Sequence, residues 1–269
     1  MRIFVSLMLL SLYAAATTAA ETQPPLKIYS AGSLRAPLTE IIKAYTAKYG
    51  TPVEVVYGAS GLLAKRLENG EPADLYTSAD RGGPESLTDS GKAGPTVTLA
   101  RNHLCAVLRP GFKSDSATIL SRLLEPAVRV STSNPQDDPG GAYAFAMFQR
   151  ADAVQSGSRA TLEAKAIKIG NGPGLVTVPP GTDNAIAWLI REKQIDVFLS
   201  YCTNGHQAEA ALPGITTVEL PSALAITANY GMTILTAARP EATRLAMFIL
   251  SPTGQKILMA HGFDAPLMP

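Results

Sequence analysis

Strand and helix patterns alternate along almost the whole chain of 269 residues, and this alternation limits the fold more than any other feature. Residues 26–30 form a short apolar run, and residues 36–50 place Leu38, Ile41 and Tyr45 on one helical face. A strand at 52–58, a helix through 62–67 and a strand at 73–80 follow. A β-α-β-α-β series of this kind predicts a mainly parallel sheet covered by helices on both faces.

The pattern changes after residue 100. The sequence predicts strands at 102–110, 127–135, 195–201 and 223–237, and helices at 140–151 and 182–194, the second with Thr182 or Asp183 as its N-cap. Two further helical segments in the tail break at Ser251 and Pro252. We expect two α/β lobes, one formed by residues 21–100 with 222–269 and the other by residues 101–221. Two chain crossings between these lobes predict a hinge, with a ligand cleft between the lobes.

The first twenty residues have the pattern of a secretory signal peptide. Arg2 precedes an apolar run at 3–12, and small residues lead to Ala20. The run is shorter than the roughly 20 apolar residues of a membrane span, and no later stretch reaches that length. We therefore expect residues 1–20 to be removed and the mature protein to be exported to a bacterial periplasm. The expected cleavage point has no cysteine that could carry a lipid, so we do not expect a lipoprotein.

The charge balance of the chain narrows the expected partners. Without Arg2, the 23 basic residues become 22, which equals the 22 acidic residues. A neutral chain gives no electrostatic reason to expect nucleic acid or an anionic membrane as partner. We expect a monomer.

Cys105 and Cys202 are the two cysteines, and an oxidising compartment favours one disulfide between them. Two buried free thiols are the alternative.

Two serines each follow a predicted strand at the point where a helix begins. Ser33 stands in SAGSLRAPLTE and Ser60 in ASGLLAKRLENG. Free N–H groups and the peptide dipole make helix N-termini suitable for anions, so two such serines could hold an oxyanion without a basic side chain. Simple N-capping is the alternative for each serine. Their repetition after successive strands favours binding, and Tyr201, at the end of the strand at 195–201, is expected to face the same cleft.

The sequence offers little support for an enzyme. Ser60 lies in Gly-Ala-Ser-Gly-Leu, which lacks the second glycine of a nucleophile elbow. The three histidines, His103, His206 and His261, have no metal-ligand spacing, and no nucleotide-binding loop follows a strand. We expect no catalytic residue, resident metal or cofactor. Asp137 and Asp138 could bind a cation, although acidic residues beside a helix start are also ordinary dipole partners.

Several segments together resemble the periplasmic molybdate-binding proteins of ABC importers, which have the two-lobed type II solute-binding fold. The resemblance covers residues 26–263 and rests on four segments, which are IYSAGSL, YGASGLLAKRLENGEPADLYTSAD, DVFLSYCTNG and the tail SPTGQKILMAHGF. NPQDDPGGAYA is similar to the family's proline-containing loop before a helix. The resemblance implies a solute-binding protein that binds molybdate or tungstate and delivers it to a membrane permease.

The resemblance also implies a ligand set. By position, the two serine hydroxyls are those of Ser33 and Ser60, and the phenol is that of Tyr201. Backbone donors would come from the two serines and from the residues Gly140 or Gly141 and Asp183. The carboxylate of Asp183 departs from the family, where an apolar side chain stands, and Asp137-Asp138 is a second acidic departure. These departures keep open a second interpretation, in which the same fold binds another small polar solute or oxyanion.

Overall fold

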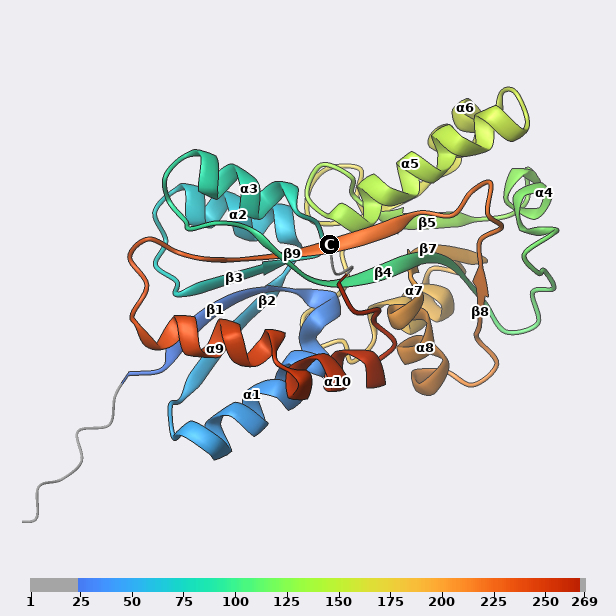
Figure 1. Cartoon of the computed structure of the whole chain (residues 1–269). Helices are drawn as coiled ribbons and strands as arrows, with labels where there is room; N and C mark the ends of the chain where they lie inside the picture. Colours follow the sequence, from blue (N-terminus) through green and yellow to red (C-terminus); the bar gives the residue numbers. More distant parts are fainter. Residues whose placement is uncertain (1–23, 267–269) are drawn as a thin grey trace, which may run out of the picture.

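A sheet of nine strands runs through the computed structural model, which describes residues 24–266, and helices cover both faces (Figure 1). The expected signal peptide at 1–20 lies outside the described residues. Strand β8 (Thr216–Glu219) pairs with β4 beside the main order. The main order is β2 (Val53–Gly58), β1 (Leu26–Ala31), β3 (Leu75–Ser78), β9 (Thr227–Ile234), β4 (Val97–Leu108), β7 (Val197–Tyr201), β5 (Val130–Ser133) and β6 (Ile167–Ile169).

The predicted β-α-β-α-β series is confirmed at the start of the chain. Strand β1 pairs in parallel with β2 and with β3, and helices α1 (Arg35–Tyr49) and α2 (Ser60–Glu68) connect them. Helix α1 buries Leu38, Ile41 and Tyr45 against β1, as the helical period predicts. It ends at Gly50, which has a φ of 71° and donates its N–H to the carbonyl of Thr46.

The middle of the sheet is antiparallel, so the prediction of a mainly parallel sheet is wrong there. Strand β9 pairs antiparallel with β3 and β4, and β4 pairs antiparallel with β7 and β8. The remaining parallel pairs, β5 with β6 and β5 with β7, lie toward the far edge. Strand periodicity shows which residues form strands but not their direction, and β4 and β9 come from distant parts of the chain.

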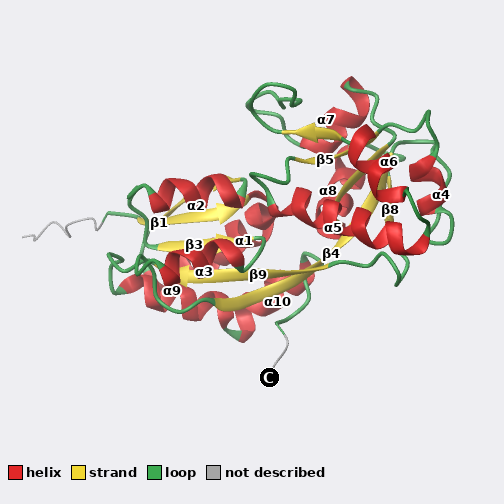
Figure 2. Cartoon of the chain, turned by 90° about the horizontal axis from the view of Figure 1, so that it is seen from above, coloured by secondary structure: helices red, strands yellow, loops and turns green. Residues whose placement is uncertain are grey.

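Strand β4 joins two halves of the molecule, each with its own core (Figure 2). Its first part, from Val97 to His103, pairs with β9, and its last part, from Leu104 to Leu108, pairs with β7. In the first half, α2 and α3 (Gly82–Asp89) cover one face, and α1, α9 (Glu241–Leu250) and α10 (Pro252–Ala260) cover the other (Figure 1). The lobe boundaries at 100 and 222 remain a prediction.

The second half has the same layered arrangement. Helices α4 (Ile119–Leu124), α5 (Pro139–Val154) and α6 (Ser158–Lys165) pack on one face. Helices α7 (Ala185–Glu192) and α8 (Cys202–Ala211) pack on the other. A disulfide joins Cys105 of β4 to Cys202, the first residue of α8. It fixes the start of α8 to the strand that joins the halves.

The predicted break in the tail is confirmed. Helix α9 ends at Leu250, and Ser251 caps α10 by accepting the N–H of Gly254 at 3.4 Å. Pro252 follows as the first residue of α10, where its missing N–H costs nothing. Among residues 24–266, no helix has both the length and the hydropathy that a membrane span requires.

Candidate functional site

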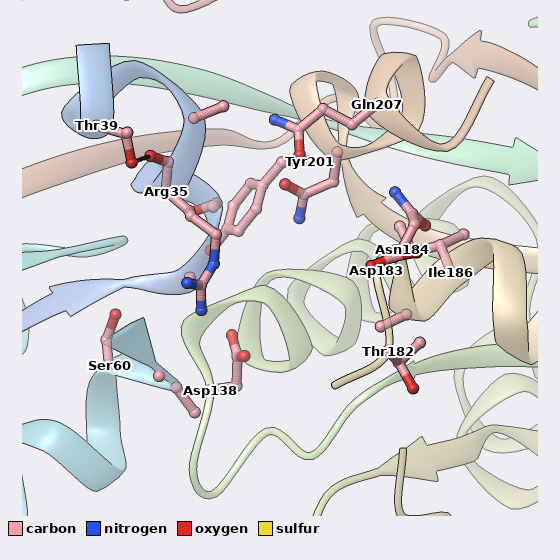
Figure 3. A pocket seen from close by; sticks show the side chains of 17 residues that line it. Arg35, Thr39, Ser60, Asp138, Thr182, Asp183, Asn184, Ile186, Tyr201 and Gln207 are labelled. Carbon is pink, nitrogen blue, oxygen red and sulfur yellow. Dashed lines mark hydrogen bonds between the residues drawn. The ribbon is translucent and has the colours of Figure 1, made fainter. Parts of the chain in front are cut away.

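A cavity of about 560 Å³ opens between the two halves, where the ends of several elements meet (Figure 3). One wall comes from the 3-10 turn Gly32–Leu34, the start of α1 and the junction of β2 with α2. The opposite wall comes from Asp138 before α5, the segment 182–186, Tyr201 at the end of β7, and α8. Ser33, Ser60, Asp183 and Tyr201 therefore line one cavity, as the sequence predicts for a single cleft.

Ser33 is held by a hydrogen bond to a buried tyrosine from another part of the chain. Its Oγ lies 2.9 Å from the Oη of Tyr230, on β9. The side-chain amide of Asn102 donates to that same Oη at 3.5 Å and to Thr203 Oγ1 at 2.9 Å. Either hydroxyl can be the donor in the contact between Ser33 and Tyr230, because the phenol oxygen can accept from Asn102 and still either donate to Ser33 or accept from it. When Tyr230 is the donor, the hydroxyl proton of Ser33 is available for the cavity.

Ser60 is the first residue of α2 and is only 2% exposed. Its Oγ accepts the N–H of Ala79 at 3.1 Å, and its carbonyl accepts the hydroxyl of Tyr76 at 2.8 Å. With its oxygen used as an acceptor, the hydroxyl can donate its proton into the cavity. Neither this serine nor Ser33 caps a helix with its side chain. The N-cap interpretation of both serines is therefore wrong.

Tyr201 places a buried phenol in the cavity wall. The residue is 4% exposed, and its Oη has no hydrogen-bond partner within the part of the chain that the structure describes. Burial raises the pKa of this phenol well above its ordinary value, so the group is a neutral hydrogen-bond donor. An unpaired buried hydroxyl costs free energy in the empty protein. The phenol therefore has an unused hydrogen bond in a residue that lines the cavity.

Gly140 and Gly141 lie at the start of helix α5 rather than in the cavity wall. Gly140 donates its N–H to Asp138 Oδ1 at 2.8 Å, and Gly141 donates to the carbonyl of Asp138 at 3.0 Å. Both N–H groups are therefore used within the cap of the helix. A Cβ at Gly141 would overlap the carbonyl oxygen of Ser133, which explains the glycine by packing. Asp138 itself lines the cavity in their place.

Asp183 lines the cavity but does not cap helix α7. The cap is Asn184, whose side chain accepts the N–H of Ala187 at 2.9 Å. The prediction of Thr182 or Asp183 as the N-cap is wrong by one or two residues, because an asparagine caps as well as an aspartate. The side chain of Asp183 is exposed at the edge of the cavity. Its carboxylate can stay in solvent when a ligand occupies the interior.

Arg35 is a lining residue that the sequence analysis did not select. Its exposed guanidinium carbon lies 4.3 Å from the ring centroid of Tyr57, and Figure 3 shows the guanidinium directed into the same space as the Asp138 carboxylate. It is the single cation among the described lining residues. The expectation of a site without a basic side chain is therefore incomplete. The sequence signal that could have identified Arg35 is its position two residues after Ser33, in the turn that begins α1.

Amide side chains from helix α8 complete the wall opposite Arg35. Asn204 and Gln207 both line the cavity, and Asn204 donates from its side chain to Ser200 Oγ at 3.1 Å. They were missed because the sequence analysis predicted no helix at 202–211. Across residues 24–266, no three His, Cys, Asp or Glu side chains cluster in a way that could hold a metal ion. The chemistry of the cavity is therefore that of hydroxyl and amide groups, one guanidinium and two carboxylates.

A profile of the bacterial extracellular solute-binding proteins matches residues 26–264. The chain belongs to this family. An uncharacterised relative from Pasteurella multocida is 34% identical over 240 residues, which cover 88% of this chain and 98% of the relative. The molybdate-binding protein of Escherichia coli is 30% identical over 146 residues, which cover 51% of this chain and 56% of that protein.

Solved structures with the same fold include other solute-binding proteins. The periplasmic molybdate-binding protein of Azotobacter vinelandii superposes with a TM-score of 0.72 at 19% identity, covering 90% of this chain and 100% of that one. The sulfate-binding protein of Mycobacterium tuberculosis gives a TM-score of 0.73 at 18% identity, covering 90% and 87%. The chain is thus a solute-binding protein of the ABC-transporter type, with the α/β fold of that family, and not an enzyme. Such proteins bind small solutes and partner with a membrane permease.

Proposed function

We propose that this solute-binding protein binds a tetrahedral oxyanion, molybdate or tungstate, in the cavity between its two halves. The observation that carries the proposal is the arrangement of three hydroxyl groups around one cavity. Ser60 uses its oxygen as an acceptor and has its proton free to donate, Ser33 can donate when Tyr230 donates to it, and the buried Oη of Tyr201 has no partner among residues 24–266. Hydroxyl donors on several sides suit an anion whose four oxygens point in different directions.

The donor arrangement also offers a basis for selecting the larger oxyanions. Donors fixed at one separation leave a smaller anion such as sulfate short of some of its hydrogen bonds. Each hydrogen bond to a charged group is worth about 1.5–3 kcal/mol, so one lost bond weakens binding by about tenfold or more. The 30% sequence identity with the molybdate-binding protein of Escherichia coli over 146 residues supports the same choice of ligand.

A second candidate ligand, another small polar solute or oxyanion, is favoured by two features of the cavity. Asp138 and Asp183 bring carboxylates to its wall beside the single guanidinium of Arg35. Its volume of about 560 Å³ exceeds the space of one small oxyanion, since a water molecule occupies only about 30 Å³. A solute with both an anionic group and hydrogen-bond donors would use all of these side chains.

The transport role adds three further proposals. The signal peptide at 1–20 would deliver the protein to the periplasm. The lobes, residues 21–100 with 222–269 and residues 101–221, would close on the solute about the β4 and β9 crossings. The closed form would then bind the permease of the ABC importer.

Calorimetric titration of the mature chain, residues 21–269, tests the choice of ligand. The protein is unfolded and refolded to remove any bound solute, then titrated with molybdate, tungstate, sulfate and phosphate. Tight one-to-one binding of the first two, with sulfate at least about tenfold weaker, is the expected result. Tight binding of phosphate alone would favour the second candidate. No heat from any of the four would contradict an oxyanion site.

A further inference from the structure

Asp138 places a carboxylate in the wall of a cavity whose proposed ligand is an anion. It is half-buried and lines the cavity, and Figure 3 shows its side chain directed into the same space as the guanidinium of Arg35. One of its oxygens, Oδ1, accepts the N–H of Gly140 at 2.8 Å and so fixes the side chain at the start of α5. The carboxylate cannot turn away from the ligand without breaking the cap of that helix.

An ionised carboxylate beside an oxyanion is repulsive, and neither group has a proton to donate to the other. Phosphate could bring its own proton as hydrogen phosphate, but molybdate and tungstate are fully ionised near neutral pH. A hydrogen bond between Asp138 and such an anion therefore requires one additional proton. This requirement follows from the position of the side chain, whichever donors surround the rest of the ligand.

We propose that the site binds its oxyanion together with one proton, held between the Asp138 carboxyl group and an oxygen of the solute. The inference rests on the proposed oxyanion function. It makes Asp138 a specificity-determining residue, because the side chain repels a dianion when ionised and donates to it when protonated.

The surroundings of Asp138 raise the pKa of its carboxyl group and so make proton uptake easier. Burial is the largest cause, and it raises the pKa of the carboxyl group; the nearby carboxylates of Asp80 and Asp137 raise it further. The N–H of Gly140 and the hydroxyl of Ser133 act in the opposite direction by stabilising the ionised form. A bound oxyanion would add negative charge on the open side and raise the pKa again.

Other charged and titratable groups around this carboxyl group leave it the best place for the proton. The neighbouring acid, Asp137, is ionised, since Lys65 donates to it at 3.0 Å and lowers its pKa. Tyr201 and Tyr230 are neutral phenols because burial raises the pKa of each. Arg35 and the exposed Asp183 also line the cavity. The positive charge of Arg35 attracts the oxyanion.

Proton uptake gives the inference a direct measurement. Molybdate is titrated into the protein at one pH in buffers with different ionisation enthalpies, and the slope of the observed heat against that enthalpy gives the number of protons taken up. We expect about one proton for the wild-type protein at a pH above the pKa of free Asp138. The affinity for molybdate should then fall by about tenfold for each further pH unit.

Two amide variants separate Asp138 from its neighbour. In Asp138→Asn the amide oxygen can still cap α5 and the amide N–H can donate to the anion, so binding should proceed without proton uptake and without pH dependence. Asp137→Asn is the matched control, and it should keep the proton uptake and pH dependence of the wild type.

Two outcomes would overturn the inference alone, namely tight molybdate binding by the wild type without proton uptake, or unchanged uptake in Asp138→Asn. The wild-type comparison between buffers decides the question even if that variant does not fold. Absence of binding for all four oxyanions would instead overturn the proposed function, and this inference with it.

Discussion

The Oγ of Ser33 lies 2.9 Å from the Oη of Tyr230, although 197 positions separate the two residues in the chain. The contact belongs to a series of hydrogen bonds that begins at Thr203 on α8 and passes through Asn102 on β4. Elements from both halves therefore contribute to the hydrogen bonds that position the Ser33 hydroxyl group. The ligand-facing turn after β1 depends on strands that the chain forms much later.

Removal of the Tyr230 hydroxyl should weaken ligand binding without loss of the fold. In Tyr230→Phe the serine proton can turn toward other acceptors, and the expected loss of affinity is about fivefold, which corresponds to about 1 kcal/mol. The free energy of unfolding should fall by about 1–2 kcal/mol, since the hydrogen bonds of this hydroxyl with Ser33 and Asn102 are both lost. Calorimetry and urea unfolding measure the two quantities. Unchanged affinity would show that this tyrosine does not orient Ser33.

The two serines should differ in their effects on stability. Both Ser33→Ala and Ser60→Ala should reduce affinity, because each removes a donor from the cavity. Ser60→Ala also leaves the buried N–H of Ala79 without its acceptor, and this should cost about 1–3 kcal/mol of stability. Ser33 is only half-buried, so water can replace its hydroxyl at lower cost.

Urea unfolding of the two alanine variants without ligand tests this difference. Thr39, another hydroxyl residue that lines the cavity, provides a matched control. Its hydroxyl donates to the Arg35 carbonyl at 2.7 Å within α1, and Thr39→Ala should have little effect on stability. Equal stability of the two serine variants would contradict the role assigned to the Ala79 contact.

The sequence predicts that the two serines lie at one edge of the sheet because the signals are local. An apolar run, a serine and an amphipathic helix occur twice, and parallel pairing of β1 with β2 brings the two strand ends to one edge. Tyr201 follows the same rule at the end of β7. The direction of β4 and β9 could not be inferred in this way, because their pairing depends on contacts between residues more than a hundred positions apart.

Asp138 shows a different limit of the sequence analysis. Asp138 followed by Pro139 has the pattern of an N-cap and first helical residue, and such a cap uses the N–H of Gly140. The sequence alone could therefore have shown that the N–H groups of Gly140 and Gly141 are not available to a ligand. The packing of α5 against the first half determines whether Oδ2, the other oxygen of the carboxylate, faces a ligand. No local sequence pattern predicts that packing.

The disulfide between Cys105 and Cys202 should contribute strongly to stability. The cysteines are 97 positions apart, and closing a loop of that length restricts the unfolded chain by on the order of 4 kcal/mol in the chain-entropy description. Reduction should lower the urea midpoint of the wild type. A Cys105→Ser, Cys202→Ser variant should have the lower midpoint with or without reductant. Thiol titration of the denatured, unreduced protein should find no free thiol; two thiols per chain would contradict the bridge.

Tyr201→Phe should separate ligand binding from stability in one variant. The phenol oxygen is buried and unpaired among the residues described, so its removal takes away an unsatisfied group rather than a hydrogen bond. The free energy of unfolding without ligand should stay the same or rise by about 1 kcal/mol, while affinity falls by about tenfold or more because a donor to a charged ligand is lost. Tyr143→Phe is a suitable control, since that ring packs 6.3 Å from Tyr201 between centroids but does not line the cavity. A Tyr201→Phe protein that binds normally would show that this hydroxyl has no role in holding the solute.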